Sequence, residues 1–382
     1  MKTVSTYVPD LGVHDKNLEK LSSELHSFHS YPGRFAPEIP REIISSYSKP
    51  YDVILDNFCG VGTSLIQAVL QKRNAIGVDS HPLACLIAKV KSSPIEPAFL
   101  KKECFRILDI LTELIIMLKK DNYELVTRSY HLPNFPNKEE WFHPFVLKEL
   151  TVVYSIIKKV EEQDIKNFLL VCFSSILREV CNPTHYKFIA DNMVPRKSQY
   201  CDVLNVFAKK LIKMIDTNEN FYRVRPKDIS SEVFCEDSRN LFMLKDSSID
   251  LALTSPPYLN QLDYMKMHRL SFYWLEIPLD YSNEIGARAK RGRKKCVSDY
   301  YDDMKTCMRE VYRVLKDDSY YVMIVGDCTK LNNKSIHIYQ ELVKIAQQVG
   351  FKFKGKVKKN QDGFFFRNHD KSNCEWIIFL QK

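Results

Sequence analysis

The sequence lacks any apolar run of the roughly 18 residues that a helix needs to cross a bilayer, so we expect no membrane span. No tract rich in Gln, Ser or Gly is typical of a disordered tail. The 11 cysteines are odd in number and include no CxxC pair of a zinc knuckle, which argues against a disulfide framework and a structural metal. Since the sequence does not open with a secretory signal peptide, we expect reduced thiols in a cytoplasmic protein.

Composition favours a globular protein with a charged partner. The 382 residues are 45% hydrophobic and 12% aromatic, which is enough to bury a core. Lys and Arg number 56 against 47 Asp and Glu, for a net charge of +9. This excess is concentrated near Arg288 and Lys356, so we expect a directed positive field, although a solvated basic surface also accounts for it. The length allows one large domain or a catalytic domain with an insertion.

Both ends of the chain predict a parallel α/β sheet. Residues 51–92 indicate a strand, a glycine turn, a helix and a second strand, which is a βαβ unit with right-handed crossover. A second block begins near Val233. We expect its strands over 233–237, 249–253 and 320–325, its helices over 303–316 and from the capping residue Ser335 to Val349, and a closing antiparallel pair over 351–359 and 375–380.

Between these blocks, helical periodicity interrupts the α/β alternation. Helices are expected over 100–120, 144–160 and 165–181. We therefore predict three parts: residues 1–98 as the N-terminal part of a catalytic domain, 99–231 as an inserted helical domain, and 232–382 as the C-terminal part of the catalytic domain.

The segment Asp56-Asn-Phe-Cys-Gly-Val-Gly-Thr63 lies where the first strand gives way to a helix, which is where open α/β sheets bind ligands. Leu65 occupies the third small position of a dinucleotide fingerprint, and no phosphate-loop Gly-Lys-Ser/Thr follows. Asp79 ends the next strand, where a carboxylate accepts hydrogen bonds from ribose hydroxyls. Two acidic strand ends favour a neutral or cationic nucleoside over a pyrophosphate, while an ordinary tight turn also explains the glycines.

The sharpest motif is Thr254-Ser-Pro-Pro-Tyr258, directly after the strand over 249–253. Two prolines cannot continue a ladder, so they present rigid carbonyls at the sheet edge. The Ser255 hydroxyl and the Pro256 carbonyl can accept hydrogen bonds from an exocyclic amine, and the Tyr258 ring can stack on an extruded base. A strand merely terminated by prolines is the alternative.

At these residues the chain resembles the DNA amino-methyltransferase family, which combines a Phe-x-Gly-x-Gly-Thr loop with an Asp/Asn/Ser-Pro-Pro-Tyr tetrapeptide. The resemblance covers about residues 26–92 and 233–382. It implies a Rossmann-like class I methyltransferase sheet, mostly parallel with an antiparallel C-terminal strand, and S-adenosylmethionine as cofactor. His29-Ser-Tyr-Pro-Gly-Arg-Phe35 looks like the family's extra cofactor segment. The cofactor residues implied are Tyr31, Phe35, Asp56, Phe58, Gly60, Gly62 and Thr63, with Asp79 on the ribose and Asp237 near the adenine amino group.

The same resemblance implies a reaction and a target. Ser255, Pro256, Pro257 and Tyr258 would be catalytic, by base flipping and direct in-line methyl transfer. The motif order is similar to the family's alpha group, in which the insertion reads the DNA. Serine in the first tetrapeptide position is similar to enzymes acting on cytosine N4, so we predict this target in duplex DNA. Adenine N6, whose enzymes more often carry Asp or Asn there, is the alternative.

Other readings remain. A base amine in structured RNA is a second possible target, although no appended RNA-binding module is found. A nucleic-acid-binding scaffold without activity is disfavoured by the intact motifs. Carbon-5 methylation needs a cysteine after proline, where Tyr258 stands. The resemblance also implies a cognate restriction endonuclease, a bacterial host, and a cytoplasmic location at the nucleoid during action.

Several segments are candidates for DNA contact. Residues 286–295 hold six basic residues and no acidic one, which indicates a phosphate-gripping loop or a solvated charge run. Residues 182–187 and 191–197 mix aromatic, amide and basic side chains, as base-reading surfaces and ordinary helix connections both do. The alternating lysines over 352–358 favour an edge strand slightly over backbone contact. The DNA-binding residues predicted are Arg288, Lys290, Arg291, Arg293, Lys294, Lys295, His185, Lys187, Arg196 and Lys197.

Overall fold

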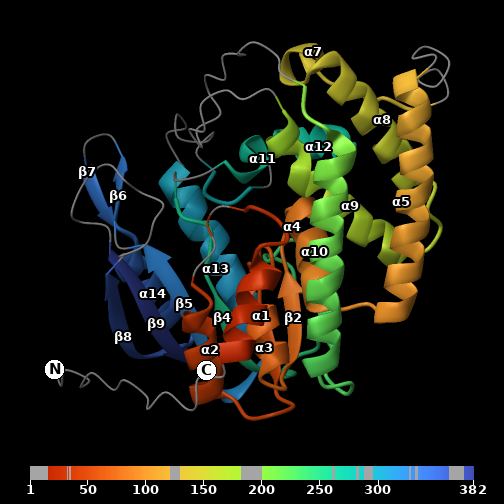
Figure 1. The fold of residues 1–382 in the computed structure, drawn as a ribbon. Coiled ribbons are helices and arrows are strands. Elements are labelled where there is room, and N and C mark those ends of the chain that lie inside the picture. The colour runs from red at the N-terminus through yellow and green to blue at the C-terminus, as the bar shows by residue number, and fades with distance from the viewer. Residues whose placement is uncertain are drawn as a thin grey trace.

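A central β-sheet organises the molecule (Figure 1). The computed structural model describes residues 16–31, 33, 36–120, 130–181, 200–259, 263–280, 284–287, 296–326, 328–331, 334–360 and 374–382. The sheet has the order β3-β2-β1-β4-β5-β9-β8. Its strands are β1 (Val53–Asp56), β2 (Asn74–Val78), β3 (Ser231–Phe234), β4 (Ile249–Thr254), β5 (Leu315–Gly326), β8 (Lys352–Asn360) and β9 (Cys374–Gln381). The pairs from β3 to β5 are parallel and β9 is antiparallel to both its neighbours, which confirms the predicted Rossmann-like sheet.

Helices cover both faces of the sheet, because successive strand residues point to opposite sides. In β1, Ile54 packs into one hydrophobic core and Leu55 into another. In β5, Val322 belongs to the first core and Met323 to the second. The first core includes residues of α1 (Lys16–His26), α2 (Glu38–Tyr47), α3 (Thr63–Leu70) and α4 (Pro82–Ser92); the second includes residues of α13 (Cys296–Val314) and α14 (Ile338–Val349).

A helical segment follows α4 in the chain and precedes β3. Its described helices are α5 (Pro97–Lys120), α7 (Lys138–Trp141), α8 (Pro144–Lys158), α9 (Gln163–Val180) and α10 (Val203–Val224). They stand together on one side of the sheet, at the right of Figure 1, with α9 against α4 and α10 against α1. Their apolar residues continue the first core, so packing joins the segment to the face of the sheet that α1 to α4 cover. The three helices expected here correspond to α5, α8 and α9.

Two expectations near the C-terminus were wrong. The helix expected over 303–316 begins earlier, at Cys296, and ends at Val314 because β5 starts at Leu315. Ser335 does not cap a helix, since it lies in β7 (Lys334–His337), which pairs with β6 (Cys328–Leu331). The helix α14 begins at Ile338 and ends before Gly350, as expected, with φ +124° at that glycine.

The lysine-rich strand β8 lies at the edge of the sheet, as predicted. Its simple alternation is broken by a register shift between Phe353 and Gly355. Lys356 Nζ lies 3.9 Å from the Trp376 ring centroid and 4.1 Å from that of Tyr339, both within reach of a cation–π contact. Among the described residues, no helix is long and apolar enough to span a membrane.

Candidate active site

Three loops meet beyond the carboxyl ends of β1, β2 and β4. β1 lies between β2 and β4, so the chain leaves it in opposite directions at a topological switch point, where ligands bind in open α/β sheets. The loops enclose about 880 Å³ of empty space, part of it open to solvent. The residues lining this cavity are Tyr31, Gly33, Phe58, Cys59, Gly60, Val61, Thr63, Asp79, Ser80, His81, Asp237, Ser238, Ser255, Pro257, Tyr264, Met265, Glu284 and Ile285.

Most of the predicted residues that the structure describes meet there. Those at the cavity wall are Tyr31, Phe58, Gly60, Thr63, Asp79, Asp237, Ser255 and Pro257. Asp56, Gly62, Pro256 and Tyr258 lie behind or beside the wall. Phe35 and all ten residues predicted to bind DNA fall outside the described residues.

Asp56 is used within the protein instead of lining the cavity. It is fully buried, and its carboxylate accepts hydrogen bonds from Ser64 Oγ at 2.5 Å and Thr254 Oγ1 at 2.6 Å. Burial raises the pKa of Asp56 from 3.8 to about 6, against the lowering effect of these hydrogen bonds. The carboxylate therefore joins the glycine loop after β1 to the end of β4. The sequence implied a cofactor contact here, and the geometry gives Asp56 a positioning role.

The glycine loop turns back toward β2 and is held by Asp79. The Gly60 amide donates to Asp79 Oδ2 at 2.8 Å and the His81 amide donates to Oδ1 at 2.9 Å. Burial raises the pKa of Asp79, and these two backbone hydrogen bonds oppose the rise. Gly60 has φ +49°, and a Cβ built on it would meet no atom within 4 Å. The loop therefore presents bare backbone to the cavity.

Aromatic rings form the opposite wall. Tyr31 stacks on His268 with centroids 4.4 Å apart and lies parallel to Tyr264 at 6.1 Å. Burial and the charge of Asp79 raise the pKa of Tyr31 well above its usual value, so its hydroxyl stays protonated. Burial lowers the pKa of His81 to about 4, so this imidazole is neutral at pH 7.

The lining suits a cationic nucleoside. It contains the carboxylates of Asp79, Asp237 and Glu284, the rings of Tyr31 and Tyr264, and, among the described lining residues, neither Lys nor Arg. Acidic groups and aromatic faces both attract a positive charge, whereas a phosphate would need cations. The sulfonium and ribose of S-adenosylmethionine fit this chemistry, with open space over Gly60 where the ligand can approach the backbone.

Asp237, predicted to lie near the adenine amino group, lines the cavity and is held there by Arg239. Arg239 Nε lies 3.0 Å from each Asp237 carboxylate oxygen, and Arg239 Nη1 donates to Asp303 at 2.7 Å. Burial alone would raise the pKa of Asp237, but the hydrogen bonds from Arg239 prevail and lower it. The carboxylate is thus fixed and ionised at the cavity wall, with Arg239 as its anchor.

The tetrapeptide delivers Ser255 and Pro257 to the cavity wall, and Tyr258 follows directly after them in the chain. Tyr258 Oη donates to Glu375 Oε1 at 2.9 Å, and the Tyr258 side chain also hydrogen-bonds that of Ser255. Burial, the charge of Glu375 and its hydrogen bond raise the pKa of Tyr258 well above its usual value. The ring predicted to stack on a base is therefore held at its hydroxyl by β9.

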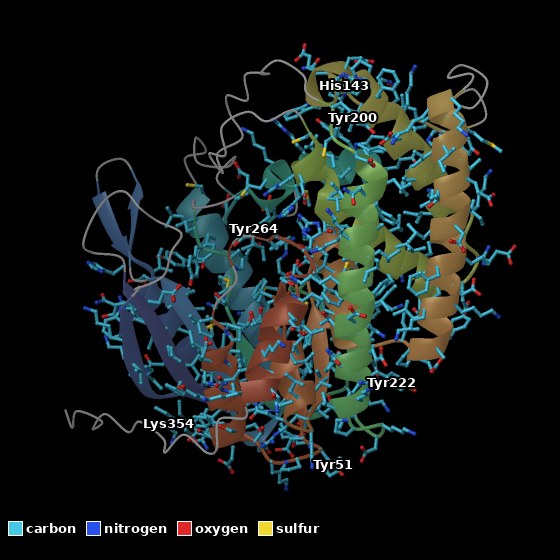
Figure 2. The ribbon with its side chains drawn as sticks, viewed as in Figure 1. Tyr51, His143, Tyr200, Tyr222, Tyr264 and Lys354 are labelled. Atoms are coloured by element: carbon cyan, nitrogen blue, oxygen red, sulfur yellow. The ribbon has the colours of Figure 1, made fainter. Side chains whose placement is uncertain are left out.

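Sequence reasoning missed the cover of the cavity. After the tetrapeptide the chain forms α11 (Tyr264–Met267) and α12 (Arg269–Trp274), and Tyr264 and Met265 line the cavity. Glu284 accepts a hydrogen bond from the Tyr264 amide at 2.9 Å and so fixes the start of α11. In Figure 2, Tyr264 lies between the sheet and the upper end of the helical segment. The aromatic spacing just beyond Tyr258 was the available signal.

Comparisons with known proteins agree on one family. A family model described as DNA methylase, covering N6 and N4 methyltransferases, matches residues 7–90 and 249–382. The chain is 26% identical over 368 residues to the type II methyltransferase M.MvaI of Kocuria varians, covering 84% of this chain and 80% of that protein. It is 23% identical over 385 residues to M.MjaII of Methanocaldococcus jannaschii, covering 80% and 72%.

Solved structures give weaker likenesses. A putative DNA modification methylase from Thermus thermophilus, solved with S-adenosyl-L-methionine, is 19% identical at a TM-score of 0.26, covering 38% of this chain and about half, 53%, of that chain. A SAM-dependent methyltransferase from Methanosarcina mazei is 12% identical at a TM-score of 0.34, covering 93% and 98%.

Proposed function

Because the chain belongs to the DNA methylase family of N6 and N4 methyltransferases, we propose that it methylates N4 of cytosine in duplex DNA. S-adenosylmethionine is the methyl donor, and it supplies an electrophilic methyl group at the cavity beside Ser255. Carboxylates, aromatic rings and the bare backbone at Gly60 form the walls that would hold it.

The observation that carries the choice of cytosine is Ser255. It occupies the first tetrapeptide position, lines the cavity, and hydrogen-bonds Tyr258. Its oxygen lone pairs can accept an amine hydrogen. Serine at this position is the family feature that accompanies cytosine N4 enzymes, whereas Asp or Asn more often accompanies adenine N6.

The reaction we propose is direct transfer by positioning. The target cytosine swings out of the duplex, and its amine donates hydrogen bonds to Ser255 Oγ and the Pro256 carbonyl. These contacts aim the nitrogen lone pair at the methyl carbon without a covalent enzyme intermediate. The Tyr258 ring, held by Glu375, bounds the base on one side.

Two segments would hold the DNA, and each leaves a described element that contacts the cavity or its cover. Residues 182–199 leave the end of α9, which is tied to the cavity cover by Arg178, donating to the Met267 carbonyl, and by Ser174, whose hydroxyl donates to Ser271 Oγ at 2.8 Å. Residues 288–295 follow the lining residue Ile285. We propose that the first segment, within the helical insertion over 99–231, reads bases and the second grips phosphates.

The deciding experiment is mass spectrometry of nucleosides from duplex DNA of diverse sequence incubated with the protein and S-adenosylmethionine. N4-methylcytosine is expected, and N6-methyladenine would overturn the choice of target. If only structured RNA is methylated, DNA is the wrong substrate. Ser255→Ala should lose most activity, while the matched Ser248→Ala, whose hydroxyl bonds to the exposed Lys245 carbonyl, should not.

A cognate restriction endonuclease belongs to the same proposal, since the relatives named above are type II methyltransferases. The enzyme would then act in the cytoplasm on nucleoid DNA. Methylated duplexes should resist an endonuclease from the same host that cuts unmethylated copies, and equal cutting of both would contradict the partnership.

A further inference from the structure

Glu375 reaches the catalytic edge from a strand far along the chain. It lies at the start of β9, where it pairs with Gly326 at the end of β5. Because β9 is antiparallel, its first residues stand at the same edge as the last residues of β4 and β5. This places the Glu375 carboxylate 2.9 Å from Tyr258 Oη. A carboxylate thus lies behind the tetrapeptide, outside the cavity lining.

Hydrogen bonds join Ser255 to Glu375 through Tyr258. The Ser255 side chain hydrogen-bonds Tyr258, and Tyr258 Oη donates to Glu375 Oε1 at 2.9 Å. Ser255 lines the cavity, so its oxygen is the end of this hydrogen-bond series that a substrate can reach. A proton placed on Ser255 Oγ has a continuous path to a carboxylate.

The surroundings leave Glu375 able to accept that proton. Among the described side chains it accepts a hydrogen bond from Tyr258 and forms no ion pair. The titratable groups near this contact are Tyr258 from the loop and Tyr264 of α11. The backbone register partners of Glu375 are Gly326 on β5 and Lys359 on β8.

We propose that Glu375 is the final acceptor of the proton released by the target amine, reached through Ser255 and Tyr258. The inference rests on the proposed function. The amine nitrogen forms a bond to the methyl carbon as the bond from that carbon to the cofactor sulfur breaks. The nitrogen gives its proton to Ser255 Oγ, Ser255 passes its own to Tyr258 Oη, and Tyr258 passes its own to Glu375. The products are a neutral methylated amine, a neutral sulfide and a protonated Glu375, which returns its proton to solvent.

This role differs from simple anchoring of the Tyr258 ring, and Glu375→Gln separates the two. The glutamine oxygen still accepts the hydrogen bond from Tyr258, but the amide cannot take up a proton. We expect the single-turnover methylation rate to fall about 10–100-fold, as for loss of a general base. Dissociation constants for DNA and S-adenosylmethionine should stay within about twofold, because neither binding surface changes. Glu341→Gln is the matched control, because Glu341 forms an exposed ion pair with Lys344 on α14. It should leave the methylation rate unchanged.

Two further measurements distinguish proton transfer from positioning. Fluorescence of a cytosine analogue at the target position should report equal base extrusion in both proteins. Tyr258→Phe should slow transfer as much as Glu375→Gln, and the double variant no further, because both interrupt one chain.

A Glu375→Gln enzyme with the wild-type methylation rate would overturn the relay, as would a slow variant whose base extrusion is equally impaired. Nucleoside analysis of the wild-type product keeps the two proposals apart. If N6-methyladenine forms, the choice of cytosine fails, while the same variant rates judge the relay for that amine. If the wild type methylates no DNA base, both proposals fail.

Discussion

Thr254 Oγ1 donates a 2.6 Å hydrogen bond to Asp56 Oδ1, joining the end of β4 to the end of β1. These neighbouring parallel strands carry the tetrapeptide and the glycine loop respectively. The contact fixes the distance between the methyl-donor side and the amine side of the cavity. The proposed in-line transfer depends on that distance, so Asp56, a buried carboxylate outside the cavity lining, would contribute by positioning the two loops.

Asp56→Asn should change the pH dependence of stability. The pKa of Asp56 is raised from 3.8 to about 6 by burial, so the folded protein holds a proton that the unfolded chain has lost between these values. Wild-type stability therefore declines from this group as pH rises from about 4 to 6, by at most about 3 kcal/mol. Asparagine cannot titrate, so its stability relative to wild type should improve over that window. Urea unfolding at pH 4, 5, 6 and 8 measures it, and a difference independent of pH would contradict the assignment.

Gly60→Ala should weaken S-adenosylmethionine binding more than it weakens the fold. The added methyl meets no protein atom within 4 Å, although φ +49° strains an alanine by about 1–2 kcal/mol. It would occupy space beside the ligand, and we expect the dissociation constant to rise about tenfold or more. Gly62→Ala is the control, since Gly62 does not line the cavity and its new Cβ would lie 3.1 Å from Ala88 Cβ. Calorimetric titration and thermal melting should rank the two variants in opposite order.

Lys91→Met should loosen the glycine loop from behind. Lys91 is 1% exposed, and its Nζ donates to the Val61 carbonyl at 2.9 Å. Losing this donor leaves a buried carbonyl unpaired, at a cost of about 1–3 kcal/mol. Because Val61 lines the cavity, cofactor affinity should fall as well. Lys89→Met is the control, because Lys89 lies on the same helix and its side chain is half-exposed. It should change neither the free energy of unfolding, measured in urea, nor the cofactor affinity, measured by titration. If Lys91→Met kept the wild-type affinity for the cofactor, the glycine loop would not depend on the hydrogen bond from Lys91.

The sequence predicted the parts of the site that local chemistry decides. In an open parallel sheet, ligands bind at the carboxyl ends of the strands. Glycines follow one such strand end and two prolines follow another, so the sequence alone placed Gly60 and Ser255 at this edge. The edge position of β8 followed in the same way from its lysines.

What the sequence could not predict depends on distant pairing. Glu284 reaches Tyr264 across a segment with no regular pattern, and Glu375 reaches Tyr258 only because β9 reverses beside β5. Ser335 has the chemistry of a helix cap, but pairing with Lys330 drew it into a hairpin instead. Each case was decided by tertiary context, which no local preference encodes.

Tyr258→Ala should reduce base binding through loss of the ring. If the ring bounds the extruded cytosine, its removal should cost about 1–3 kcal/mol in binding of the target base. Tyr258→Phe keeps the ring, so it should extrude the base normally while transferring the methyl group slowly. Fluorescence of a cytosine analogue in the duplex measures extrusion for both variants. Tyr222→Ala, on the partly exposed surface of α10, controls for loss of an aromatic side chain. Normal extrusion by Tyr258→Ala would mean that the base stacks elsewhere, and would leave Tyr258 only its hydroxyl contacts with Ser255 and Glu375.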